Sequence, residues 1–121
     1  MTVVSDLMPQ TASDARQGPR ANVSWAARIA MGPQAYLEAR VVNVSEEGLC
    51  LVCEQAFAEG AVLNVLIALP DPADRSRYTY PSLQTRVVFH VLKGAKVRVG
   101  TRILSTDPAT KSALAQWVKK G

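Results

Sequence analysis

The sequence predicts a mainly β fold, in which six short antiparallel strands form a small barrel and one C-terminal helix packs against it. Three observations lead to this class. Runs of alternating apolar and polar residues recur along the chain, turn signals separate them, and only the last segment has helical periodicity. A chain of 121 residues, 48% hydrophobic and 20% charged, is long enough for one globular domain.

The six predicted strands are bounded by glycine, proline or polar turns. In chain order they occupy residues 22–30, 35–44, 49–54, 61–69, 83–91 and 97–103. The fourth is apolar on both faces apart from Asn64, which is typical of a buried central strand. In the fifth, one face is predicted to hold Leu83, Thr85, Val87, Phe89 and Val91. Residues 71–82 are expected to form a polar loop, unless 78–80 extend the fifth strand.

The final segment is predicted to be a helix over about residues 107–119. Asp107 is a favoured N-cap residue, and Pro108 follows it at the first helical position. Apolar side chains then recur at helical spacing, at Ala113, Leu114, Trp117 and Val118. Such a stripe indicates that the helix covers an opening or an edge of the barrel.

The chain divides into a tail and one domain. Residues 1–14 are polar and without periodicity, which predicts a flexible N-terminal tail, and residues 15–121 are predicted to form the barrel with its helix. No stretch has the pattern of a secretory signal or the length of an apolar membrane span. With two cysteines in such a chain, we expect a cytoplasmic protein without membrane insertion.

The residues that enzymes use are not arranged for catalysis. The sequence has one histidine, His90, and contains no nucleophile elbow, phosphate-binding P-loop or zinc-protease motif. Cys50 and Cys53 stand three apart in one predicted strand, where they point to opposite faces, so we interpret them as core cysteines rather than a disulfide or metal pair. We therefore expect no enzyme, no cofactor and no bound metal.

Two short motifs suggest a ligand. Residues 16–20 form an RxxxR with Arg16 and Arg20, and residues 43–48 form an NxSxxG with Asn43, Ser45 and Gly48 at a predicted strand–turn–strand. Chance alone gives roughly 0.6 RxxxR matches in a chain of this composition but only about 0.03 matches to [DN]xSxxG. The pair, in this order on these elements, resembles the PilZ domain, over about residues 15–118.

That resemblance implies a six-stranded PilZ-type barrel that binds cyclic di-GMP through Arg16, Arg20, Asn43, Ser45 and Gly48. The chemistry agrees, because a guanidinium binds phosphate or the O6 and N7 atoms of guanine, and Asn and Ser side chains can meet a base edge. Gly48 is expected to adopt a positive φ or to let the ligand approach the backbone. The alternative is ordinary turn chemistry for 43–48 and solvated tail charges for the arginines.

The functional expectation is a receptor or adaptor. Cyclic di-GMP would change the protein's surface and so regulate an unidentified effector protein, in motility, pilus or exopolysaccharide control as the resemblance implies. The alternative is a PilZ-like interaction module that binds no nucleotide. With a formal net charge of +4 and seven aromatic residues, the sequence does not suggest an oligonucleotide-binding barrel, so no nucleic acid is expected as a partner.

Overall fold

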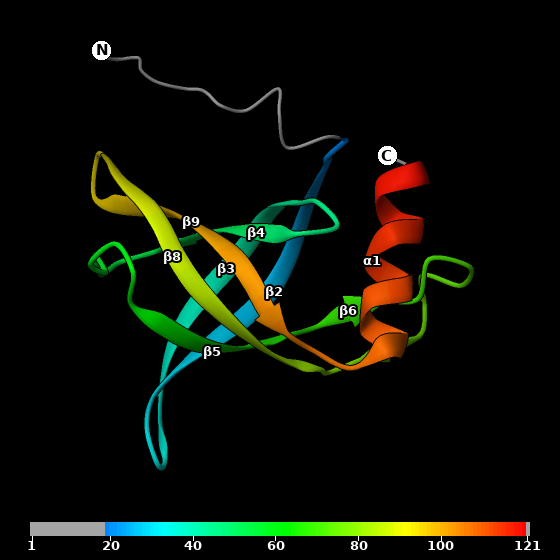
Figure 1. Cartoon of the computed structure of the whole chain (residues 1–121), viewed down its shortest axis with the longest axis horizontal. Helices are drawn as coiled ribbons and strands as arrows, with labels where there is room; N and C mark the ends of the chain where they lie inside the picture. The colour runs from blue at the N-terminus through cyan, green and yellow to red at the C-terminus, as the bar shows by residue number, and fades with distance from the viewer. Residues whose placement is uncertain (1–18, 121) are drawn as a thin grey trace.

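Six antiparallel strands close into a barrel in the order β2-β3-β4-β9-β8-β5, as the computed structural model shows (Figure 1). The structure describes residues 19–120. The barrel strands are β2 (Ala21–Gly32), β3 (Ala35–Val44), β4 (Gly48–Cys53), β5 (Val62–Ile67), β8 (Ser82–Lys93) and β9 (Lys96–Ser105). The predicted six-stranded barrel is therefore confirmed.

The core of the barrel consists of the inward side chains of these strands. Every barrel strand contributes at least one apolar side chain that is completely or almost completely buried: Ile29, Val41, Leu51, Val65, Leu83 and Val99. Burying an aliphatic side chain of this size contributes about 1.5–3 kcal/mol to the stability of the folded state. The outward residues on the same strands remain available for other contacts.

The fourth and fifth predicted strands differ from expectation. β5 is not buried on both faces, because Leu63, Val65 and Ile67 point inward while Val62 is 47% exposed. β8 alternates as predicted only as far as Val87. A β-bulge at Val88 then shifts the register, so that Val87 pairs with Thr101 but Phe89 pairs with Gly100. Phe89 therefore lies on the outer face.

The helix α1 (Pro108–Lys120) covers one end of the barrel. Asp107 is its N-cap, since Oδ1 accepts a hydrogen bond from the Thr110 amide at 2.7 Å. Leu114, Trp117 and Val118 belong to the core cluster. Trp117 packs edge-to-face on Trp25 of β2 at 5.5 Å between ring centroids. The predicted helix is confirmed, and because the barrel is closed it covers an opening rather than an edge.

A small second sheet forms around the segment predicted as a polar loop, and it includes Leu69, which was predicted to end the fourth barrel strand. β6 (Leu69–Pro70) pairs with β7 (Tyr78–Thr79), so the tyrosine run does not extend β8. The Pro70 carbonyl accepts a hydrogen bond from Trp117 Nε1 at 2.8 Å, which ties this sheet to the helix. No helix in the described part of the chain is long and apolar enough to cross a membrane.

Candidate functional site

The turn between β3 and β4 is closed by Ser45. Its Oγ accepts hydrogen bonds from the backbone amides of Glu47 at 3.2 Å and Gly48 at 3.0 Å, and its own amide donates to the Gly48 carbonyl at 3.0 Å. The residue is only 7% exposed. Ser45 thus uses its hydroxyl to hold the turn, which is the contact expected from turn chemistry.

Gly48 is needed because strand β9 passes very close to it. A Cβ at this position would overlap the backbone carbonyl oxygen of Thr101. The expected positive φ is not observed, since Gly60 and Gly94 are the glycines of the described residues with that conformation. The Glu47 carbonyl also accepts a hydrogen bond from the Ile103 amide at 2.8 Å, so the turn is fixed to β9.

Asn43 lies on the outer face near the end of β3. It pairs with Asn22 of β2, and its Nδ2 donates a hydrogen bond to Asn22 Oδ1 at 3.0 Å. This leaves Asn43 Oδ1 as an acceptor and Asn22 Nδ2 as a donor toward solvent. Asn22 was not among the predicted site residues, because irregularities in both β2 and β3 hide the register from simple counting along the hairpin.

Cys50 lies on the same outer face, next to Asn43 on one side and Gly100 on the other. It is 8% exposed, and Arg98 Nη1 donates a weak hydrogen bond to its Sγ at 3.6 Å. Burial raises the pKa of the Cys50 thiol, and the charges of Arg98 and Arg20 oppose this increase. Arg20 directly precedes Ala21, the first residue of β2, and stands two positions before Asn22, the partner of Asn43.

The two cysteines do not form a pair. Cys53 belongs to the core cluster as predicted, whereas Cys50 is buried on the opposite, outer side of the strand. Both thiols are free. Among residues 19–120 there is no cluster of three or more side chains suited to a metal ion.

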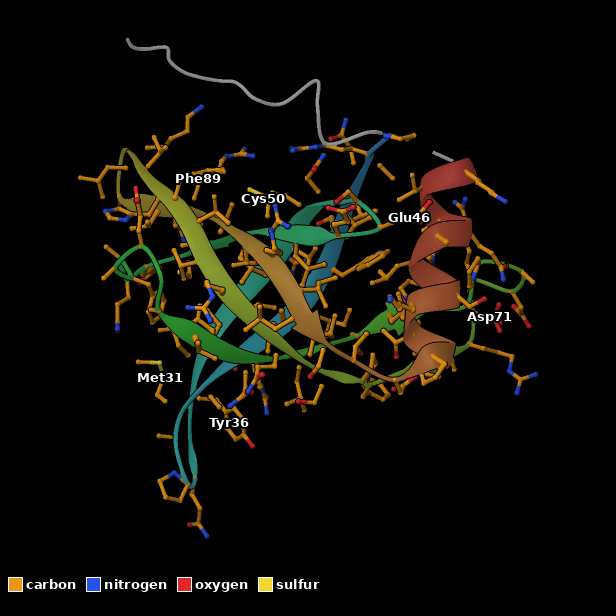
Figure 2. The ribbon with its side chains drawn as sticks, viewed as in Figure 1. Met31, Tyr36, Glu46, Cys50, Asp71 and Phe89 are labelled. Atoms are coloured by element: carbon orange, nitrogen blue, oxygen red, sulfur yellow. The ribbon has the colours of Figure 1, made fainter. Side chains whose placement is uncertain are left out.

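Arg20 and Arg98 place positive charge on this face, and neither is ion-paired with a described residue. The ion pairs within the described residues are Arg28–Glu38 and Lys96–Glu54, which involve neither arginine. Figure 2 shows Cys50 and Phe89 on the side of the barrel opposite Met31 and Tyr36. We call the set Arg20, Asn22, Asn43, Cys50, Phe89, Arg98 and Gly100 the outer face.

The predicted site residues thus fall into three groups. Arg20 and Asn43 lie at the same end of the β2–β3 hairpin, where Asn22, two residues after Arg20, pairs with Asn43, and Asn43 also pairs with Cys50. Ser45 and Gly48 lie at the turn between β3 and β4 and fix its conformation. Arg16 lies outside the described residues.

Comparison with known proteins identifies the fold family. The PilZ domain model matches residues 14–120. The chain belongs to the PilZ family. PilZ domains are typically receptors for cyclic di-GMP and are generally non-catalytic. No curated protein sequence matches this PilZ chain significantly.

Two solved structures resemble this one. The Bacillus subtilis inhibitor of motility, MotI/DgrA, has a TM-score of 0.75 at 18% identity, over 88% of this chain and 51% of that one. The PilZ domain of YcgR from Escherichia coli, solved with c-di-GMP, has a TM-score of 0.59 at 13% identity, over 84% and 86% of the two chains. This chain therefore spans about half the length of the Bacillus protein, and the likeness at these identities shows the shared fold.

Proposed function

We propose that this PilZ domain is a cyclic di-GMP receptor that changes its surface on nucleotide binding and so regulates a partner protein. The observation that supports this best is the position of Arg20, from the RxxxR motif, two residues before Asn22 of β2, which pairs with Asn43 of the NxSxxG motif. The register of β2 with β3 thus brings the two motifs, more than twenty residues apart in the chain, to the same end of this hairpin.

The charge on this face suits an anionic ligand. Cyclic di-GMP carries two phosphates, and a guanidinium donates paired hydrogen bonds to a phosphate or to the O6 and N7 atoms of guanine. Arg20 is exposed and is not ion-paired with a described residue. Arg16, which lies outside the described residues, is proposed as a second arginine of the same kind.

The two asparagines offer a polar pair for a base edge. Once Asn43 Nδ2 donates to Asn22 Oδ1, an acceptor on Asn43 and a donor on Asn22 remain for a ligand. Guanine presents the complementary pattern, with N1–H and N2–H donors next to the O6 acceptor. The pair is thus proposed to bind a base edge, and it does not by itself distinguish guanine from adenine, whose N6–H donor and N7 acceptor also match it.

Ser45 and Gly48 are proposed to contribute by holding the turn rather than through exposed side-chain contacts. Ser45 is buried and hydrogen-bonded within the turn, and Gly48 lies against β9. Their effect on binding then comes through the position of the Asn43 end of β3. A ligand at this turn would meet its backbone.

Regulation would follow from the new surface that the nucleotide forms on the outer face together with the arginines of the RxxxR motif. The nucleotide can shift partner binding only by its different affinity for the free and partner-bound forms. A partner in motility, pilus or exopolysaccharide control, within the cytoplasm, is consistent with the family. The relative solved from Bacillus subtilis is named as an inhibitor of motility.

Isothermal titration of the purified protein with cyclic di-GMP tests the receptor, with GTP and the linear dinucleotide as controls. Arg20→Ala should weaken binding by roughly 10- to 150-fold, the loss of a charge-assisted hydrogen bond. Its melting temperature should not change, because Arg20 is exposed. Arg77→Ala, an exposed arginine in the loop between β6 and β7, is the matched control and should bind normally.

Two results would contradict the receptor. Saturation with GTP at the same affinity would show that the site does not select the cyclic dinucleotide. Absence of heat at high micromolar ligand, confirmed by a second method, would leave the PilZ-like interaction module, which then has to be pursued through its protein partners.

A further inference from the structure

Phe89 has an unusual place for a large aromatic residue. The bulge at Val88 turns it from the core to the outer face, where it pairs with Gly100. It remains 41% exposed. Figure 2 shows it on the same side of the barrel as Cys50, the neighbour of Gly100 on the next strand.

Gly100 allows the ring to lie flat on the sheet. A Cβ built at Gly100 would overlap three consecutive ring atoms of Phe89, with Cδ2 at 2.7 Å and Cε2 and Cζ nearer still. If the β-carbon position lay in the plane of the ring, beyond its edge, it would be much farther from Cδ2 and Cζ than from Cε2, the atom between them. The ring therefore presents one face to Gly100, and its opposite face looks away from the barrel.

We propose that this outward face of Phe89 is a stacking surface for one guanine base of the nucleotide. The inference rests on the proposed function and adds a base contact that neither sequence motif contains. Exposed aromatic rings on a β-sheet are a common means of binding bases, because every base offers a π-face. Arg98, two residues before Gly100 and therefore on the same face of β9, supplies positive charge on this side of the barrel.

The register separates this surface from the asparagine pair. From Phe89 the cross-strand neighbours are Gly100, Cys50 and Asn43. Three interstrand steps of about 4.8 Å give roughly 14 Å, which is wider than one base. Phe89 and the Asn43–Asn22 pair therefore contact different bases of a ligand that has two, and Phe89 adds affinity without selecting the base.

Phe89→Leu is the decisive variant, because leucine still covers Gly100 with an apolar side chain but has no ring to stack on. Titration with cyclic di-GMP should show affinity reduced by roughly 5- to 150-fold, the range for one lost stack. Phe89→Trp should bind at least as well as wild type. Its emission should fall on binding, whereas the native Trp25 and Trp117, both buried, should not respond.

Tyr36→Ala is the matched control, since this tyrosine is 49% exposed but lies on the opposite side of the molecule (Figure 2). The dependence of affinity on salt concentration distinguishes the stacking contact from the charge contacts. The loss in Phe89→Leu should be the same at low and high salt, whereas Arg20→Ala should weaken the salt dependence of binding.

The outcomes are distinct. Wild-type affinity in Phe89→Leu, with an unchanged melting temperature, overturns the stacking surface and leaves the receptor intact. If both Phe89→Leu and Phe89→Trp bind the nucleotide more weakly, and the tryptophan emission is not quenched, Phe89 has a purely structural role. That result also overturns the stacking surface. Wild-type protein that binds no cyclic di-GMP removes both proposals.

Discussion

The backbone carbonyl oxygen of Thr101 lies so close to the place where a β-carbon of Gly48 would stand that no side chain fits between β4 and β9 at this position. Strand pairing holds both residues in place, because Gly48 pairs with Arg102 and Leu49 with Thr101. Gly48 is thus a packing requirement of the barrel, whatever it does for a ligand.

Gly48→Ala should therefore destabilise the free protein. Forcing a methyl group into this contact requires the turn or β9 to move, which costs about 1–3 kcal/mol and lowers the melting temperature by several degrees in a domain of this size. Thermal melts without ligand measure it. Gly32→Ala is the control, because nothing lies within 4 Å of a Cβ there. Equal melting temperatures for both variants would contradict the packing role.

Ser45→Ala should also destabilise the protein, for a different reason. The substitution removes the acceptor for the amides of Glu47 and Gly48 while the turn stays partly buried. Unsatisfied groups of this kind cost about 1–3 kcal/mol. Chemical denaturation should show this loss, whereas Ser112→Ala on the exposed side of α1 should not. An unchanged midpoint for Ser45→Ala would mean that water replaces the hydroxyl.

The sequence was sufficient for the strand count, the helix and its cap, because alternation, turn residues and Asp107-Pro108 are local signals. It was not sufficient for the outward turn of Phe89. The alternation of β8 continues unbroken through Val87, Phe89 and Val91, and only pairing with β9 inserts the bulge at Val88. A bulge is a property of two strands, and a pattern read along one strand does not contain it.

The candidate site, like the fold, was predictable from the sequence only in part. The motifs identified Arg20 and Asn43, which the fold brings to one face, but their local pattern could not separate a ligand contact from a turn contact at Ser45. Asn22 was missed because its hydrogen bond to Asn43 depends on register across an irregular hairpin.

The Cys50 thiol should react slowly in the folded protein. Burial raises its pKa despite the nearby Arg98 and Arg20, so little thiolate is present near neutral pH. Because the pKa of this thiol is raised in the folded state, the stability that the neutral thiol contributes is fully present below the unfolded pKa. It is lost as pH rises through the folded pKa. Stability should thus decline above about pH 9.

Labelling with iodoacetamide at pH 8, followed by mass spectrometry of the Cys50 peptide, measures this directly. The unfolded chain in denaturant is the control and should react much faster. Arg98→Ala should slow the folded-state labelling further, since it removes a charge that favours the thiolate. Labelling of folded and unfolded protein at one rate would contradict the burial of this thiol.

The N-cap of α1 gives the fold a dependence on acid. The Thr110 amide and hydroxyl donate to the Asp107 carboxylate, and these hydrogen bonds hold its pKa below the ordinary value. For a lowered pKa, the stabilisation is present above the unfolded pKa and is lost as pH falls through the folded pKa, in the region below about pH 4.

Asp107→Ala should lower the melting temperature at pH 7, and its difference from wild type should shrink toward pH 2. Asp107→Asn keeps an acceptor that cannot be protonated, so its melting temperature should lack this part of the acid dependence. A difference between wild type and Asp107→Ala that is the same at pH 7 and pH 2 would show that the carboxylate charge does not stabilise the helix.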